Sequence, residues 1–280
     1  MKRYGVIGYP LTHSLSPLIH NYAIKQLQLD ASYQKMEIRP QSFDDEIIKL
    51  KESGIAGFNI TIPFKERIIP FVENIDNDAL ALGAVNTIRV KNGEWQAFNT
   101  DVAGFISPLK VLNISFEKCL VLGAGGAARA VIYALGRYFR PEEIRIAARN
   151  KAKAQKIADY FAPLIKPVNT SYTSIDDTAD QVKNFDLIIN ATPVGTYPDT
   201  DQSPLPGLHQ WSKGAVIYDL VYNPIKTRFL EEAAKAGEEM ILINGMKMLL
   251  AQAAEAFKLW TGMTMPVMEV ERYMSEQHFL

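Results

Sequence analysis

A lysine closely follows a short alternation of polar and apolar residues in "GFNITIPFKE" (57–66). Asn59 and Thr61 alternate with isoleucines, which is typical of a β-strand, and Pro63 ends the pattern before Lys65. An ammonium group at this point could stabilise an alkoxide forming on a bound ketone and give it a proton. A lysine taken alone is more often a solvated surface residue, so the motif needs partners before it predicts chemistry.

Three further polar clusters in the N-terminal part of the chain offer such partners. They are "THSLSP" (12–17), "GAVNT" (83–87) and "FNTDVAG" (98–104). Their hydroxyl, amide and carboxylate groups suit a small polyhydroxylated or carboxylated ligand. Each group also has a purely structural explanation, because Ser16 can cap a helix and Asp101 can cap the segment that follows it.

A glycine-rich turn, "VLGAGGAARA" (121–130), joins a predicted strand to a predicted helix. Gly123, Gly125 and Ala128 match the dinucleotide-binding pattern G-x-G-x-x-G/A. The first glycine permits the tight turn, the second lets backbone approach a pyrophosphate, and the small third residue lets the helix pack closely. A turn that serves packing alone is the alternative. The residues predicted to hold the dinucleotide here are Gly123, Ala124, Gly125, Gly126, Ala127 and Ala128.

The type of dinucleotide is indicated by "AARNK" (147–151), at the end of the second strand of this unit. A protein that binds NAD usually places Asp or Glu here to accept from the ribose 2′-hydroxyl. Arg149 instead offers a planar cation suited to a 2′-phosphate, with Ala148 and Asn150 beside it and no carboxylate nearby. NADP is therefore the predicted cofactor. The alternative is that Arg149 only solvates the strand end.

Two series of alternating strands and helices organise the chain, and the first closes with a hairpin over 83–99 that turns at Asn92 and Gly93. Apolar strands separated by helices predict parallel sheets. Ser16 and Ser42 are the predicted N-caps of the first two helices. The remaining predicted strands are 4–8, 33–38, 57–62, 118–123, 142–149, 186–192 and 215–221, and the predicted helices are 16–29, 42–53, 126–139, 151–161, 245–262 and 266–274.

The composition excludes several classes of partner. The chain has 280 residues, 48% hydrophobic and 22% charged, with a formal net charge of −1, so we expect no nucleic-acid or membrane binding. No apolar run is long enough to span a bilayer. The lone Cys119 permits no internal disulfide, and the four histidines show no metal-ligand spacing. We therefore predict a cytoplasmic protein that binds a small molecule and no metal, as a monomer or homodimer.

The order of the motifs resembles that of shikimate dehydrogenases. The polar clusters and the glycine turn are followed by "NATPVG" (190–195) and "GMKMLLAQ" (245–252), and the resemblance runs from about residue 4 to residue 272. It implies an α/β fold of two domains. Residues 1–101 plus 245–280 would form the substrate-binding catalytic domain, to which the C-terminal helices return. Residues 102–244 would form a Rossmann-like, doubly wound NADP-binding domain.

The resemblance also implies an activity, the NADPH-dependent reversible reduction of 3-dehydroshikimate to shikimate in chorismate and aromatic amino acid biosynthesis. Lys65 and Asp101 become the catalytic pair. A carboxylate favours the charged lysine, so we expect Asp101 to position Lys65 and to hydrogen-bond the substrate. The expected substrate-binding residues are Ser14, Ser16, Asn59, Thr61, Asn86, Tyr222 and Gln252. The expected cofactor contacts beyond the glycine turn and residues 148–150 are Thr192, Leu220 and Gly245.

The sequence departs from the family pattern at a few positions. Ala148 and Asn150 stand where Asn and Thr or Ser are frequent, which leaves fewer side chains for a 2′-phosphate. Thr196 replaces a frequent methionine and Asn244 a frequent aspartate. Three alternatives stay open: a quinate/shikimate dehydrogenase that uses NAD as well as NADP, a methylenetetrahydrofolate-type dehydrogenase, and a non-catalytic module that senses shikimate or quinate.

Overall fold

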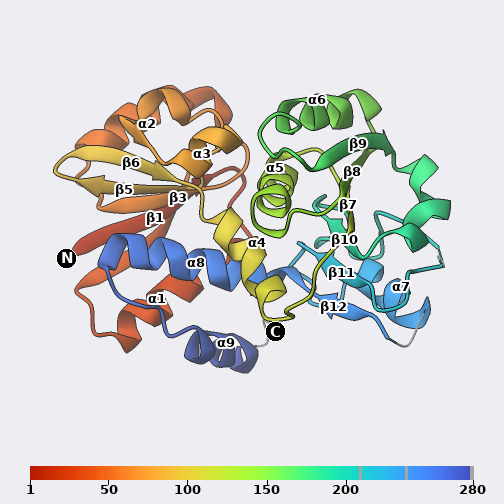
Figure 1. The fold of residues 1–280 in the computed structure, drawn as a ribbon. Coiled ribbons are helices and arrows are strands. Elements are labelled where there is room, and N and C mark those ends of the chain that lie inside the picture. The colour runs from red at the N-terminus through yellow and green to blue at the C-terminus, as the bar shows by residue number, and fades with distance from the viewer. Residues whose placement is uncertain (208–209, 237–238, 278–280) are drawn as a thin grey trace. The chain divides into compact units, whose positions relative to one another are not determined.

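The computed structural model describes residues 1–207, 210–236 and 239–277 (Figure 1). The chain divides into two compact units, and each is described by itself. Unit 1 comprises Met1–Asp101 and Leu250–Leu280, and unit 2 comprises Val102–Leu249. Two of the histidines considered above, His209 and His278, lie outside the described residues.

The centre of unit 1 is a six-stranded mixed sheet with the order β2-β1-β3-β5-β6-β4. Strands β2, β1 and β3 are parallel, β3, β5 and β6 are antiparallel, and β4 runs parallel to β6. The predicted hairpin is confirmed, since Asn92 (φ 54°) and Gly93 (φ 84°) turn β5 into β6. The strands are β1 (Lys2–Gly8), β2 (Ala31–Glu37), β3 (Gly57–Ile60), β4 (Asn74–Ile75), β5 (Thr87–Lys91) and β6 (Glu94–Phe98).

Helices cover both faces of this sheet, with α2 and α3 on one face and α1 and α8 on the other (Figure 1). On the α2 side, Phe58 and Ile60 of β3 join Phe43 in an apolar core. Among the described residues, no helix has both the length and the apolar character that a membrane crossing requires. The helices are α1 (Ser16–Gln26), α2 (Phe43–Glu52), α3 (Asn77–Leu82), α8 (Gly245–Thr261, of which residues from Leu250 belong to unit 1) and α9 (Val267–Glu276), with 3-10 turns at Pro40–Ser42 and Ile69–Phe71.

Two predicted caps and several predicted element ends differ from the structure; for example, the helix predicted over 16–29 ends at Gln26. Ser16 is the first residue of α1 and Leu15 is its N-cap, so the predicted cap is wrong by one position. Ser42 does occupy the N-cap position of α2, but its hydroxyl donates to the Arg39 carbonyl instead of capping. Strand β3 ends at Ile60 rather than at residue 62. Thr61 N and the Ile62 carbonyl still bond to Ile7 and Tyr9, and the Thr61 carbonyl accepts from Phe64 N in the turn that follows.

An aromatic cluster fills the space between the sheet and helices α1 and α8. His20 stacks on Tyr33 with ring centroids 4.3 Å apart, and Trp260 stacks on Tyr4 at 5.1 Å. Trp260 Nε1 donates to the Ile88 carbonyl of β5 at 2.8 Å, which fastens α8 to the sheet. His20 is fully buried, and neither imidazole nitrogen has a hydrogen-bond partner among the described residues. Burial lowers the pKa of His20 to about 3.

Unit 2 is built on a six-stranded parallel sheet with the order β12-β11-β10-β7-β8-β9. This is the doubly wound order in which the first strand, β7, lies beside the fourth, β10, so that the winding reverses between them. The strands are β7 (Lys118–Leu122), β8 (Glu143–Ala148), β9 (Asn169–Ser174), β10 (Leu187–Asn190), β11 (Val216–Asp219) and β12 (Ile241–Ile243).

The helices of unit 2 pack on this sheet, and Phe105 of α4 stacks on Tyr218 of β11 with centroids 5.3 Å apart. Strands β9 and β12 and helix α7 were not predicted. Both strands lie at edges, and β9 reads "NTSYTS", which lacks the apolar run expected of a central strand. The helices are α4 (Asp101–Lys110), α5 (Gly126–Ala134, extended by a π-helical turn at Leu135–Phe139), α6 (Lys151–Phe161) and α7 (Arg228–Ala236), with a 3-10 segment at Asp176–Asn184.

The buried His20 predicts a pH-dependent stability. Its pKa is about 3 in the folded state and about 6.5 when unfolded, so the unfolded chain binds more protons between these values. The free energy of unfolding should therefore fall by about 2 kcal/mol between pH 7 and pH 5 through this residue alone. His20→Phe and His20→Gln, neither of which can titrate, should both lack this loss in denaturant titrations at the two pH values. An unchanged pH dependence in both variants would contradict the prediction.

Candidate active site

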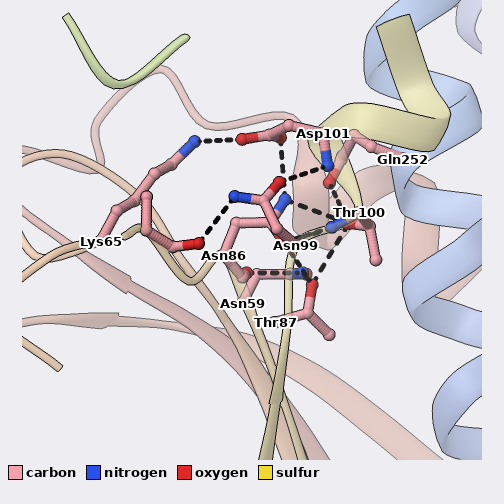
Figure 2. Close-up of polar contacts among 9 residues, drawn as sticks. Asn59, Lys65, Asn86, Thr87, Asn99, Thr100, Asp101 and Gln252 are labelled. Atoms are coloured by element: carbon pink, nitrogen blue, oxygen red, sulfur yellow. Dashed lines mark hydrogen bonds and ion pairs between the residues drawn. The ribbon is translucent and has the colours of Figure 1, made fainter. Parts of the chain in front are cut away.

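Lys65 and Asp101, the two residues predicted to act as a catalytic pair, form an ion pair in unit 1. Lys65 Nζ donates to Asp101 Oδ2 at 2.6 Å (Figure 2). The side chains are 19% and 11% exposed, so both are largely shielded but still reachable from solvent. An accessible ammonium next to a carboxylate is an arrangement that can exchange a proton with a bound hydroxyl or ketone.

The backbone around the pair is fastened across three segments of the chain. The carbonyl of Lys65 accepts from Val85 N at 2.8 Å, which ties the turn after β3 to the "GAVNT" segment. Asn99 binds the next connection, since its Nδ2 donates to the Ala84 carbonyl at 2.9 Å and its Oδ1 accepts from Asp101 N at 3.0 Å. The two charged side chains therefore start from a well-fixed backbone.

Asn86 holds the carboxylate from the other side. Its Nδ2 donates to Asp101 Oδ1 at 2.8 Å and to Thr100 Oγ1 at 3.0 Å, while its Oδ1 accepts from Thr100 N at 2.7 Å (Figure 2). Asn86 is buried, so these bonds are shielded from water. Each oxygen of the Asp101 carboxylate thus receives a hydrogen bond, which fixes its orientation.

Asn59, also predicted to contact the substrate, has both ends of its amide engaged within the protein. Its Oδ1 accepts from the Tyr33 hydroxyl at 2.7 Å, and its Nδ2 donates to Thr87 Oγ1 at 3.0 Å and to the Asn86 carbonyl at 3.3 Å. Only 6% of the residue is exposed. The geometry gives Asn59 a positioning role, and substrate contact by it stays a prediction.

The other predicted substrate residues of unit 1 lie at three places. Ser14 and Ser16 are half-buried at the start of α1, in a loop that is held where Glu37 Oε2 accepts from Leu11 N at 2.7 Å. Thr61 lies in the turn between β3 and Lys65. Gln252 of α8 comes within 3.5 Å of Thr100 Oγ1 (Figure 2). The structure thus brings Gln252 to the same network as the ion pair.

The glycine-rich turn of unit 2 has a conformation that fits a dinucleotide. Gly123 has φ 117°, which favours glycine, and a Cβ there would lie 3.0 Å from the Ala191 carbonyl oxygen. Gly125 is the N-cap of α5, and a Cβ there would meet nothing within 4 Å, so its surroundings are open. Ala128 is fully buried against the sheet. Backbone N–H groups at the start of α5 are therefore placed to receive phosphates.

The end of β8 fits a 2′-phosphate through charge more than through hydrogen-bonding side chains. Arg149 and Asn150 are exposed, and Ala148 is buried and offers no polar atom. Asn150 is the N-cap of α6, where its Oδ1 accepts from Lys153 N at 3.1 Å. Lys151 and Lys153 lie in the first turn of that helix, so cations gather around Arg149. These residues fit NADP.

The loops after β10 and β11 carry the remaining predicted cofactor residues and are linked by buried polar groups. Thr192 N and Oγ1 donate to Asn190 Oδ1 at 3.0 and 2.6 Å, and Asn190 Nδ2 donates to Asp219 Oδ1 at 2.9 Å. Asp219 Oδ2 also accepts from Thr227 Oγ1 at 2.6 Å. Burial raises the pKa of Asp219 to about 6, although hydrogen bonds from Thr227, Val221 N and Asn190 oppose this shift.

Leu220 and Gly245, both predicted to lie at the cofactor, are neighbours in unit 2. A Cβ at Gly245 would lie 2.1 Å from the Leu220 carbonyl oxygen, so only glycine permits this approach. Gly245 N donates to the Val221 carbonyl at 3.1 Å. Tyr222 follows in the same loop, is half-buried, and has its pKa raised by burial.

Several residues that build these networks were not predicted as functional. Thr87, Asn99 and Thr100 lie within the quoted "GAVNT" and "FNTD" segments, and their position beside predicted site residues was the available signal. Tyr33 gave no such signal, because an aromatic residue in a strand is normally part of a core. Asp219 could have been noted as a carboxylate at the end of an apolar strand.

A doubly wound parallel sheet with a glycine turn after its first strand defines a dinucleotide-binding class of protein. Three family models match the chain: the shikimate dehydrogenase substrate binding domain over residues 6–88, shikimate / quinate 5-dehydrogenase over residues 108–221, and the shikimate 5′-dehydrogenase C-terminal domain over residues 245–272. The chain belongs to the shikimate dehydrogenase family, which confirms the predicted resemblance and fold class.

Individual relatives support this membership over nearly the whole length. The shikimate dehydrogenase (NADP(+)) of Methanopyrus kandleri is 40% identical over 281 residues, covering 98% of this chain and 94% of that protein. The protein of the same name from Shouchella clausii is 39% identical over 265 residues, 93% of each chain. The structure of shikimate 5-dehydrogenase from Thermus thermophilus with NADP(H) and shikimate has a TM-score of 0.86 at 33% identity and covers 100% of both chains.

The buried Asp219 should contribute strongly to the stability of unit 2. Asp219→Ala removes the acceptor for three donors, on Asn190, Thr227 and Val221, and should lower the free energy of unfolding at pH 7 by about 3 kcal/mol. Asp219→Asn keeps an acceptor oxygen and the shape of the side chain, so its loss should be clearly smaller. Calorimetric unfolding of both variants tests this. Equal losses in the two variants would show that the hydrogen bonds to Asp219 contribute little.

Proposed function

We propose that this protein catalyses the reversible, NADPH-dependent reduction of 3-dehydroshikimate to shikimate. The observation that carries the proposal is the partly exposed Lys65–Asp101 ion pair, in which Lys65 Nζ lies 2.6 Å from Asp101 Oδ2. Relatives at 39–40% identity are named shikimate dehydrogenase (NADP(+)). A non-catalytic sensing module would have no need of an ordered proton-exchanging pair, and this pair is complete.

The proposed reaction requires the protein to stabilise charge on one oxygen, that of the substrate ketone. NADPH, when bound, supplies the hydride to the ketone carbon. As negative charge develops on the carbonyl oxygen, the Lys65 ammonium stabilises it and gives it a proton. In the direction of shikimate oxidation, the lysine accepts the hydroxyl proton. Asp101 keeps Lys65 in place and offers an acceptor to a substrate hydroxyl, while Asn86 keeps Asp101 in place.

The two units carry residues suited to different tasks, one to substrate binding and catalysis and the other to cofactor binding. We assign substrate binding and catalysis to unit 1, with contacts from Ser14, Ser16, Thr61 and Gln252, and cofactor binding to unit 2. Substrate contact by Asn59, Asn86 and Tyr222 stays a prediction. This assignment is supported by the match of residues 6–88 to a substrate binding domain and by the glycine turn at 123–128. The predicted boundary at residue 245 and the contact boundary at 249/250 both fall in α8.

We also propose a cytoplasmic location, since the lone Cys119 is a free, buried thiol and an NADPH-dependent biosynthetic step belongs with reduced cofactor. Whether the protein is a monomer or a homodimer stays a prediction.

Lys65→Ala should abolish most of the turnover while leaving substrate binding largely intact. Loss of the general acid and base costs about 10²–10⁴-fold in rate, so kcat with shikimate and NADP should fall by about 10³-fold. The dissociation constant for shikimate, measured by calorimetry, should change by less than about tenfold. Lys51→Ala is a matched control, because Lys51 also pairs with a carboxylate in unit 1, that of Glu73. A Lys65→Ala enzyme with the kcat of Lys51→Ala would refute the role of Lys65.

Arg149 should decide the preference for NADP over NAD. The purified protein should oxidise shikimate faster than quinate and use NADP better than NAD when the two substrates are crossed with the two cofactors. Arg149→Ala should raise KM for NADP about 30-fold, in line with the loss of a charge-assisted contact, and leave KM for NAD nearly unchanged. Arg137→Ala, an exposed arginine of unit 2 outside the site, is the control. Equal effects on both cofactors would place Arg149 away from the 2′-phosphate, and preference for quinate would contradict the proposed substrate.

A further inference from the structure

The Tyr33 hydroxyl begins a buried chain of hydrogen bonds that ends at the catalytic pair. It donates to Asn59 Oδ1 at 2.7 Å, although Tyr33 belongs to β2 and Asn59 to β3, with β1 between them. Asn59 Nδ2 then donates to Thr87 Oγ1 at 3.0 Å, across the antiparallel register that pairs these two residues. Tyr33, on the edge strand β2, is thereby connected to β5.

The hydrogen-bond chain continues to the Asp101 carboxylate, and each donor in it points toward Asp101. Thr87 Oγ1 donates to Asn86 Oδ1 at 3.0 Å, and Asn86 Nδ2 donates to Asp101 Oδ1 at 2.8 Å (Figure 2). Hydrogen bonds that follow one another head to tail polarise and strengthen one another in a low-dielectric interior. They also fix which end of each amide is oxygen, because a flipped Asn59 would present its NH₂ group to the Tyr33 O–H and its oxygen to the carbonyl of Asn86.

Tyr33 is placed so that its hydroxyl serves this chain. The residue is buried and its ring stacks on His20, whose nitrogens make no hydrogen bond to the described residues. Burial raises the pKa of the Tyr33 phenol well above its ordinary value, while a hydrogen bond from Ser16 acts against that shift, so the O–H keeps its proton and donates. The same hydroxyl donates to Asn59, which leads to Asp101.

We propose that Tyr33 is a positioning residue for the reaction, acting on Asp101 and Lys65 through Asn59, Thr87 and Asn86. In this assignment it acts on the reacting groups only through these residues, since its hydroxyl is buried and donates to Asn59 Oδ1. Its hydroxyl sets the orientation of two amides, and the second of these holds the carboxylate that holds the lysine. The inference rests on the proposed function, because it assumes that the hydrogen-bond chain acts on a catalytic Lys65–Asp101 pair.

Tyr33→Phe removes one oxygen and keeps the stacked ring, so it tests the hydroxyl alone. We expect kcat for shikimate oxidation to fall about tenfold, equivalent to about 1.4 kcal/mol, with KM for NADP within about twofold of the parent value. Tyr4→Phe is the matched control, because Tyr4 is a buried tyrosine of the same aromatic cluster. Its hydroxyl reaches the Trp260 carbonyl at 3.4 Å and is not part of the hydrogen-bond chain. Tyr4→Phe should keep the parent kcat.

A second pair of variants tests Thr87, in the middle of the hydrogen-bond chain. Thr87→Val keeps the shape of the side chain and removes its hydroxyl, whereas Thr87→Ser keeps the hydroxyl. Thr87→Val should lose kcat by at least the factor seen for Tyr33→Phe, and Thr87→Ser should restore most of it. Thermal unfolding of all four proteins shows that each is folded at the assay temperature. Because the comparison is between kcat values of folded proteins, a merely structural role would not produce this pattern.

The outcomes separate this inference from the proposed function. If the parent protein turns over shikimate and Tyr33→Phe matches it in kcat, or falls no further than Tyr4→Phe, the positioning role of Tyr33 is overturned while the function stands. If Thr87→Ser is as slow as Thr87→Val, the hydroxyl chain is likewise overturned. If the parent protein shows no activity with shikimate and either cofactor, the proposed function itself fails first.

Discussion

The polar side chains of unit 1 are arranged around a lysine and an aspartate that pair in a place that water reaches only in part. Removing an ion from water costs several kcal/mol, and the mutual attraction of a pair offsets this only when the remaining hydrogen-bonding groups are satisfied. Asp101 meets that condition, since Lys65 binds one of its oxygens and Asn86 the other. A largely shielded pair of this kind is weak evidence for stability, and the proposed function gives it a chemical role instead.

The sheet of unit 1 meets this requirement by giving its two faces different tasks. On the α2 side, Phe58 and Ile60 pack into an apolar core that makes the sheet stable. On the opposite side, Asn59 and Thr87 lie side by side in register and carry hydrogen bonds instead of apolar contacts. Alternation along a strand makes this possible, because neighbouring residues point to opposite faces.

In unit 2 a buried carboxylate likewise organises the polar groups around it. Asp219, at the end of β11, receives hydrogen bonds from Asn190 and Thr227 and thereby links the loops that follow β10 and β11. These loops lie at the carboxyl end of the sheet, where doubly wound folds bind their ligands. In both units, hydrogen bonds within a buried polar network fix the position of loop residues, because the donors and acceptors of the network are matched.

The sequence by itself determined the local features: the glycine turn, the Asn92–Gly93 hairpin, most helices and strands, and the types of residue at the site, because these depend on neighbours within a few positions. It placed Lys65 and Asp101 together only through resemblance. Tertiary structure alone decided that Tyr33 meets Asn59 and that Asn59 meets Thr87, residues 26 and 28 positions apart in sequence. The physical reason is that strand order and register determine which side chains face each other, and neither is encoded in any one segment.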